Sequence, residues 1–173
     1  RHIIGFKGDT RKILIVDDKD KNRAALKDML LPLGFEIAEA VDGQDALAKA
    51  TPFHPNLILM DMMMPVMDGI EATRRIREED QYPVSSDQYP VSSDQYPVII
   101  GISASAFDTT RQVSLRAGCD DFLAKPIQLD DLTEKLQIHL KLEWIYEGEA
   151  DGHHFQSGVH LSAPIVPPPA EEL

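Results

Sequence analysis

Five polar residues with complementary chemistry stand at the ends of short apolar runs in this chain. They comprise three carboxylates, one hydroxyl and one ammonium group: Asp17, Asp18, Asp61, Ser103 and Lys125. An aspartate after a strand commonly caps the next helix by accepting backbone N–H groups, so each carboxylate alone is a weak indication of chemistry. If the fold gathers all five at one place, they form a reactive site.

The chemistry that such a set supports is phosphoryl transfer with a divalent cation. Crowded carboxylates repel one another and need a cation, and oxygen ligands without Cys or His favour Mg²⁺. The ammonium group of Lys125 would neutralise one phosphoryl oxygen, and the hydroxyl of Ser103 would donate a hydrogen bond to another. A remaining carboxylate can be the nucleophile and form an aspartyl phosphate.

The elements that must position these groups alternate regularly along the chain. Apolar runs predict strands at 12–16, 35–40, 56–60, 98–103 and 121–124. Amphipathic segments predict a helix after each strand. Five strand–helix units in strict alternation predict an α/β fold, a parallel sheet with helices on both faces. Right-handed crossovers then place the ends of all strands, and with them the polar residues, on one rim.

Four motifs together resemble the receiver domain of two-component response regulators: "ILIVDD", "LILMDMMMPVMDGIEATRRIR", "VIIGISA" and "AGCDDFLAKPI". The resemblance covers about residues 12–142, and the combination of motifs is highly specific. It implies a flavodoxin-like (CheY-like), doubly wound (βα)5 fold whose parallel strands take the order 2-1-3-4-5. It also implies a role in two-component signal transduction.

The resemblance gives the acidic residues particular roles. Asp61 corresponds to the phosphoacceptor, which takes a phosphoryl group from a phosphohistidine. Asp17 and Asp18 correspond to the acidic pair that binds Mg²⁺, with Asp18 as the direct ligand, and Asp61 contributes to the same metal site. The backbone carbonyl of Met63 corresponds to a further metal ligand. The implied cofactor is therefore Mg²⁺.

The resemblance also implies a switch beside the acceptor. Lys125 and Ser103 correspond to the family's catalytic lysine and switch hydroxyl, and Phe122 to the aromatic side chain that rotates when the hydroxyl moves. Pro126 is expected to follow a cis peptide bond, and the small Ala104 to leave the acceptor open. The domain would assist its own phosphorylation and dephosphorylation, and the sequence contains no motif of a kinase domain.

Two other functions stay open on the sequence. A haloacid-dehalogenase-like phosphatase also uses an aspartate nucleophile after a strand, but it requires a second aspartate two residues on, where this chain has Met63. A degenerate receiver would act as a non-phosphorylated protein-docking module, but it would normally lack the acid pair, the acceptor or the lysine. The partner expected for a phosphorylatable receiver is a histidine kinase or a histidine phosphotransfer domain, and the expected state is a monomer or weak dimer.

Composition limits the other partners and the location. A formal net charge of -12 disfavours direct binding to nucleic acid or to an anionic membrane surface. Cys119 is the only cysteine, which fits a reducing compartment, and we expect it to be a packed residue rather than a nucleophile. No apolar run approaches the roughly 18 residues that span a bilayer. We therefore expect a cytoplasmic domain, although its parent protein could be membrane-associated.

Changes of composition predict the boundaries. We expect an N-terminal linker at 1–11, the receiver at 12–146 and a proline-rich linker without a fold at 147–173. The stretches "IIGFKG" and "PIVPPPAEEL" resemble linkers that flank the receivers of hybrid sensor histidine kinases, so we expect such a parent protein.

A seven-residue phrase, "DQYPVSS", repeats within residues 80–95. Each copy contains a proline that breaks a helix, which argues against a coiled coil despite the period of seven. Only the last copy runs into an apolar strand. We interpret residues 80–95 as an insertion in a surface loop on the rim opposite the polar residues, where extra length costs little stability.

Overall fold

A parallel sheet of five strands forms the centre of the molecule. The computed structural model describes residues 2–79, 96–104 and 108–148. The sheet has the order β3-β2-β4-β5-β6. Its strands are β2 (Lys12–Val16), β3 (Glu36–Ala40), β4 (Leu57–Asp61), β5 (Val98–Ser103) and β6 (Asp121–Ala124). Counted within this sheet alone, the order is 2-1-3-4-5, so the predicted flavodoxin-like fold is confirmed.

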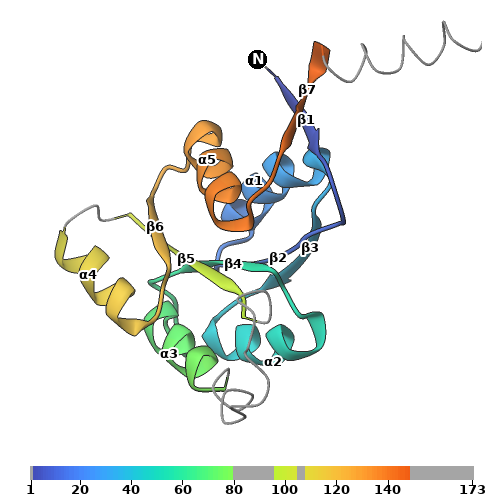
Figure 1. Cartoon of the computed structure of the whole chain (residues 1–173). Coiled ribbons are helices and arrows are strands. Elements are labelled where there is room, and N and C mark those ends of the chain that lie inside the picture. Colours follow the sequence, from blue (N-terminus) through green and yellow to red (C-terminus); the bar gives the residue numbers. More distant parts are fainter. Residues whose placement is uncertain (1, 80–95, 105–107, 149–173) are drawn as a thin grey trace, which may run out of the picture.

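Helices cover both faces of the sheet, as the alternating pattern predicted. They are α1 (Asp20–Leu30), followed by the 3₁₀ helix η1 (Leu31–Leu33), α2 (Gly43–Phe53), α3 (Gly69–Glu79), α4 (Asp108–Ala117) and α5 (Leu129–Leu140). Helices α1 and α5 lie on one face, and α2, α3 and α4 lie on the other (Figure 1). Each parallel crossover therefore returns the chain so that all strands end on the same rim.

The core has two layers, one on each face of the sheet. Successive residues of a strand point to opposite faces, so Ile13 and Ile15 of β2 join the layer under α1 and α5. Leu14 and Val16 join the layer under α2 and α3. In the described part of the chain, α4 contributes no residue to either cluster. Burying a large apolar side chain stabilises the folded state by about 1.5–3 kcal/mol. Because α4 contributes no such side chain to the two clusters, it is the helix with the weakest apolar anchoring.

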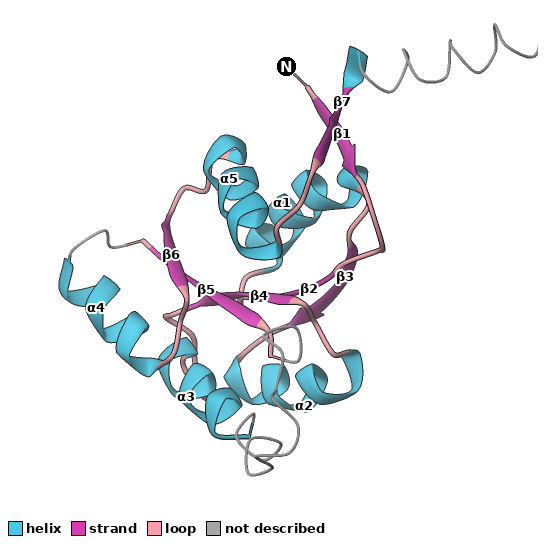
Figure 2. Cartoon of the chain, viewed as in Figure 1, coloured by secondary structure: helices cyan, strands magenta, loops and turns pink. Residues whose placement is uncertain are grey.

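A two-stranded antiparallel ribbon joins the beginning and the end of the domain. It consists of β1 (Ile3–Phe6) and β7 (Trp144–Tyr146), and it stands apart from the main sheet (Figure 2). The ring of Phe6 packs on Phe35 at a centroid distance of 4.6 Å and meets Trp144 edge-on at 6.2 Å. This aromatic cluster closes the end of the core layer below α1 and α5.

The ribbon differs from what the sequence pattern indicated, since no strand was expected before Lys12 or after the last helix. Strands of four and three residues are too short for a clear alternation, and their partner lies more than a hundred residues away. The repeat at 80–95 and all but the first two residues of the linker expected at 147–173 lie outside the described residues. None of the helices described is long and apolar enough to cross a membrane.

Candidate functional site

Three carboxylates from two strand ends meet at the carboxyl rim of the sheet. Asp17 follows β2, and Asp61 is the last residue of the fully buried β4. Each of Asp17, Asp18 and Asp61 offers an oxygen, and these oxygens all lie within 4.8 Å of one another. Asp17 and Asp61 are both 3% exposed, whereas Asp18 is more open to solvent. The sequence prediction that these residues converge is therefore confirmed.

Lys125 supplies the positive charge of the site. Its Nζ lies 3.5 Å from Oδ2 of Asp17 and 3.5 Å from Oδ2 of Asp61. The backbone N–H of Lys125 donates to the carbonyl of Ser103 at 2.8 Å, which fixes the end of β6 beside the end of β5. The Lys125–Pro126 peptide bond is cis, as expected. One ammonium group beside three carboxylates leaves the site with a net negative charge.

This donor set fits a hard divalent cation. Among the described residues the cluster offers carboxylate oxygens and no Cys or His ligand, which is the chemistry that Mg²⁺ prefers. Burial raises the pKa of Asp61, and the nearby Asp17 carboxylate adds to this, while the N–H of Met63 and the ammonium of Lys125 oppose it. The carboxylate form of Asp61 is thus costly without a cation, and a cation would favour it.

Helix α1 holds Asp17 through residues that the sequence analysis did not single out. The backbone N–H of Lys19 donates to Oδ1 of Asp17 at 2.9 Å, and Asn22 Nδ2 donates to Oδ2 at 3.1 Å. Arg23 Nη1 donates to the backbone carbonyl of Asp17 at 2.7 Å. Their position in the first turn of the helix after the acid pair was the only signal in the sequence that could have indicated these contacts.

The loop after Asp61 packs tightly because glycine stands at two close approaches. A Cβ at Gly69 would lie 2.1 Å from the carbonyl oxygen of Asp61, and one at Gly43 would lie 2.5 Å from that of Met67. Gly43 also donates its N–H to Met67 at 2.9 Å, so the loop rests on the start of α2. Within this loop Val66 has a φ of 68°, and its side chain is 83% exposed.

The residues expected to form the switch lie on β5, which pairs with the strand of Asp61, and on β6, the next strand of the sheet. Ser103 is buried at the end of β5, and Phe122 is buried on β6, paired in register with Gly101. Phe122 lines a cleft of about 300 Å³ together with Arg111 and Lys135. Ala104, next to Ser103, is exposed.

A mainly apolar cleft adjoins the acidic site. It has a volume of about 440 Å³ and lies between α1 and the segment after β6. Leu26 and Met29 of α1 and Ile127 contribute its apolar walls, and Asp17 and Lys125 lie at its polar end. The cleft thus offers apolar contact next to the carboxylates.

Comparison with known proteins identifies the family to which this arrangement corresponds. The family model of the response regulator receiver domain matches residues 13–137. Sensor histidine kinase RcsC of Escherichia coli K12 is 36% identical over 131 residues, which cover 76% of this chain and 12% of that protein. Probable transcriptional regulator ycf27 of Cyanophora paradoxa is 31% identical over 131 residues, covering 76% of this chain and 48% of that protein. The chain thus spans half or less of these relatives.

Two solved structures show the same fold. One is the receiver domain of sensor histidine kinase PA1611 from Pseudomonas aeruginosa PAO1, which has a magnesium ion coordinated in its active site cleft. It is 32% identical to this chain with a TM-score of 0.63, and the match covers 77% of this chain and 99% of that one. The receiver of Saccharomyces cerevisiae Ssk1, crystallised with the histidine phosphotransfer protein Ypd1, is 29% identical with a TM-score of 0.67, covering 74% and 87%. The phosphatase alternative has no support from these matches.

Proposed function

The chain belongs to the family of response regulator receiver domains, and from this premise we propose that it accepts a phosphoryl group from a phosphohistidine onto Asp61. The single observation that carries the proposal is the meeting of Asp17, Asp18 and Asp61 within 4.8 Å beside Lys125. A docking module would not need this costly concentration of buried charge.

The reaction follows from the chemistry of these side chains. The carboxylate of Asp61 attacks phosphorus in line, the P–N bond of the phosphohistidine breaks, and the imidazole leaves with the bonding electrons. Lys125, which lies 3.5 Å from Asp61, binds a phosphoryl oxygen as charge spreads over the phosphoryl group. Asp17, Asp18, Asp61 and the carbonyl of Met63 would hold Mg²⁺, which supplies positive charge for the same oxygens when bound. Water later hydrolyses the acyl phosphate.

The donor is a histidine kinase or a histidine phosphotransfer domain. The apolar cleft beside α1 leads directly to Asp17 and Lys125, so a donor helix that packs there would bring its phosphohistidine to the site. The Ssk1 receiver, which is similar to this chain, forms a complex with a histidine phosphotransfer protein. The relatives include both a sensor kinase and probable transcriptional regulators, and of these two kinds of parent protein we propose the hybrid sensor kinase.

Phosphorylation would change the face formed by α4, β5 and β6. Ser103 would turn its hydroxyl toward the new phosphoryl group, and Phe122 would follow inward. The weak apolar anchoring of α4 supports this assignment, because a helix with few buried apolar contacts moves at low cost.

Intact mass spectrometry after incubation with acetyl phosphate and Mg²⁺ tests the proposal. We expect a gain of one phosphoryl group in the wild type, and no gain with EDTA or in the Asp61→Asn variant. Asp28→Asn, which removes an exposed carboxylate of α1, is the matched control and should gain the group normally. No gain in folded wild-type protein would overturn the proposal in favour of the non-phosphorylated docking module.

A further inference from the structure

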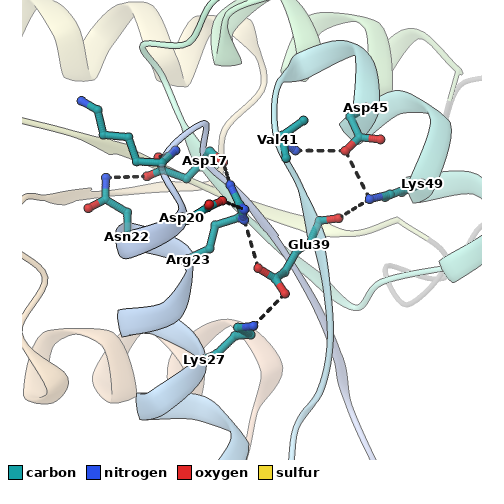
Figure 3. A network of polar contacts seen from close by, with 10 residues as sticks. Asp17, Asp20, Asn22, Arg23, Lys27, Glu39, Val41, Asp45 and Lys49 are labelled. Carbon is teal, nitrogen blue, oxygen red and sulfur yellow. Dashed lines mark hydrogen bonds and ion pairs between the residues drawn. The ribbon is translucent and has the colours of Figure 1, made fainter.

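We infer that Arg23 is a positioning residue for the metal site, acting on the peptide unit between Asp17 and Asp18. The inference rests on the proposed function, because it concerns how the same carboxylates are held for Mg²⁺. Arg23 does not itself belong to the acidic cluster. Its contacts, drawn in Figure 3, connect that cluster to α1, β3 and α2.

Arg23 is a buried cation whose three guanidinium nitrogens all make polar contacts. The residue is only 8% exposed. Its Nη1 donates to the carbonyl of Asp17 at 2.7 Å, its Nε donates to Oε1 of Glu39 at 3.0 Å, and its Nη2 pairs with Asp20. Burial of such a charge is costly unless it is paired and hydrogen-bonded, and here each of the three guanidinium nitrogens has a partner. The rigid fork of donors therefore fixes the Asp17 carbonyl in one direction.

The Asp17 carbonyl matters because it belongs to the peptide plane that connects the two acidic residues. Rotation of this plane would turn Asp18 relative to Asp17, and both carboxylates must converge on one cation. Asp17 is already fixed by its N–H, which donates to Ala40 at 3.1 Å, and by its side chain, which accepts from Lys19 and Asn22. The bond from Arg23 fixes the remaining free group, the carbonyl. Removing a contact that orients metal ligands in this way typically lowers metal affinity by about 10–100-fold.

Glu39 holds the guanidinium in place from the neighbouring strand. Oε2 of Glu39 also pairs with Lys27 at 2.8 Å, and Lys27 and Arg23 keep the pKa of Glu39 below its usual value. The backbone carbonyl of Glu39 accepts from Lys49 of α2 at 2.7 Å. Figure 3 shows this chain of contacts running from α2 through β3 to Arg23 and the end of β2.

Lys27 provides a matched control, because it pairs with the same carboxylate but does not contact Asp17. Arg23→Met and Lys27→Met each remove one positive charge near Glu39. If only the charge mattered, both variants would bind Mg²⁺ slightly more tightly, since the site becomes more negative. A positioning role predicts the opposite for Arg23→Met alone. Arg23→Lys keeps the positive charge but loses the planar, rigid set of guanidinium N–H donors.

The experiment is a titration of each variant with MgCl₂, followed by the backbone amide signals of residues 17–19 and 61–63 in NMR spectra. Signal dispersion and thermal unfolding without metal show that each variant is folded. We expect the Kd for Mg²⁺ to rise about tenfold or more in Arg23→Met, to rise at least about threefold in Arg23→Lys, and to stay within about twofold of wild type in Lys27→Met.

The possible failures are distinguishable. No saturable shift in the wild type would overturn the proposed function and this inference with it. Saturable binding in the wild type, with an unchanged Kd in a folded Arg23 variant, would overturn only the role of Arg23. If Arg23→Met does not fold, Arg23→Lys decides by the same criterion. An equal rise of the Kd in Lys27→Met would also overturn the inference, because the effect would then follow the loss of a partner of Glu39 and not the contact with the Asp17 carbonyl.

Discussion

Replacing Asp61 by asparagine should make the protein more stable when no cation is present. At an effective dielectric constant of about 20, unit charges about 4.8 Å apart repel by about 3.5 kcal/mol. The variant loses two such repulsions, from Asp17 and Asp18. It also loses the attraction to Lys125 at 3.5 Å, worth about 4.7 kcal/mol on the same scale. The two repulsions together exceed the attraction by about 2 kcal/mol, so we expect the variant to be more stable by this amount, which corresponds to a rise in Tm of about 4–8 °C for a chain of this size.

The stability gained in the Asp61→Asn variant should depend on pH, and the pKa of Asp61 determines the direction of this dependence. Burial raises this pKa in the folded state, so the folded protein binds the proton more readily than the unfolded chain does. The wild type therefore loses stability as pH rises from the ordinary aspartate pKa through the raised value. The stability difference between variant and wild type should be full at pH 7.5 and should shrink as the solution is acidified.

Thermal unfolding followed by circular dichroism in EDTA at pH 7.5 and at acidic pH checks this prediction. Asp28→Asn, an exposed acid on α1, is the control and should change the free energy of unfolding by less than about 0.5 kcal/mol. Added Mg²⁺ should stabilise the wild type and narrow the difference, because it binds the folded site. An Asp61→Asn variant that unfolds at or below the wild-type temperature in EDTA would refute the reasoning.

Three further predictions concern the loop after Asp61 and the repeat at 80–95. Val66→Asn should raise the urea midpoint by the equivalent of about 1 kcal/mol, because asparagine tolerates the positive φ better than a β-branched residue, and an unchanged midpoint would contradict this. Gly69→Ala should lower the free energy of unfolding by at least about 2 kcal/mol, since its Cβ would meet the carbonyl of Asp61 at 2.1 Å, whereas Gly148→Ala, with nothing within 4 Å, should be nearly neutral. Deleting residues 80–93 should change stability by less than about 1 kcal/mol in chemical denaturation, and phosphorylation of Asp61 should be unaffected; a loss of either would show that the repeat supports the fold.

The sheet and the acidic site could be predicted because their signals are local. Each strand is a short apolar run, and the functional side chains stand where the run ends, as Asp61 does after "LILM". Parallel connection then brings these ends together whatever the details of packing. The packed position expected for Cys119 is confirmed as well, and its burial raises the pKa of the thiol to about 11.

The contacts that depend on tertiary geometry could not be read from the sequence. Arg23 looks like an ordinary charged helix residue, and only the position of β3 beside α1 turns it toward Glu39 and the carbonyl of Asp17. The positive φ of Val66 is imposed by the loop that Gly43 and Gly69 allow to pack closely, since valine alone would disfavour it. The ribbon of β1 and β7 depends on pairing between segments at opposite ends of the domain.

That ribbon also determines how the domain responds to mechanical force. Ile3 pairs with Tyr146, and the N–H of Glu147 donates to the carbonyl of His2 at 2.9 Å, so the outer ends of the two strands lie side by side. Tension applied through these outer ends should break the backbone pairs of the ribbon one after another, beginning at Ile3 and Tyr146, instead of loading all of them at once. The last pair, Phe6 with Trp144, lies against the core, so pulling would expose the single tryptophan while the five-stranded sheet stays intact. A change in tryptophan fluorescence is therefore the result we expect when tension opens the ribbon.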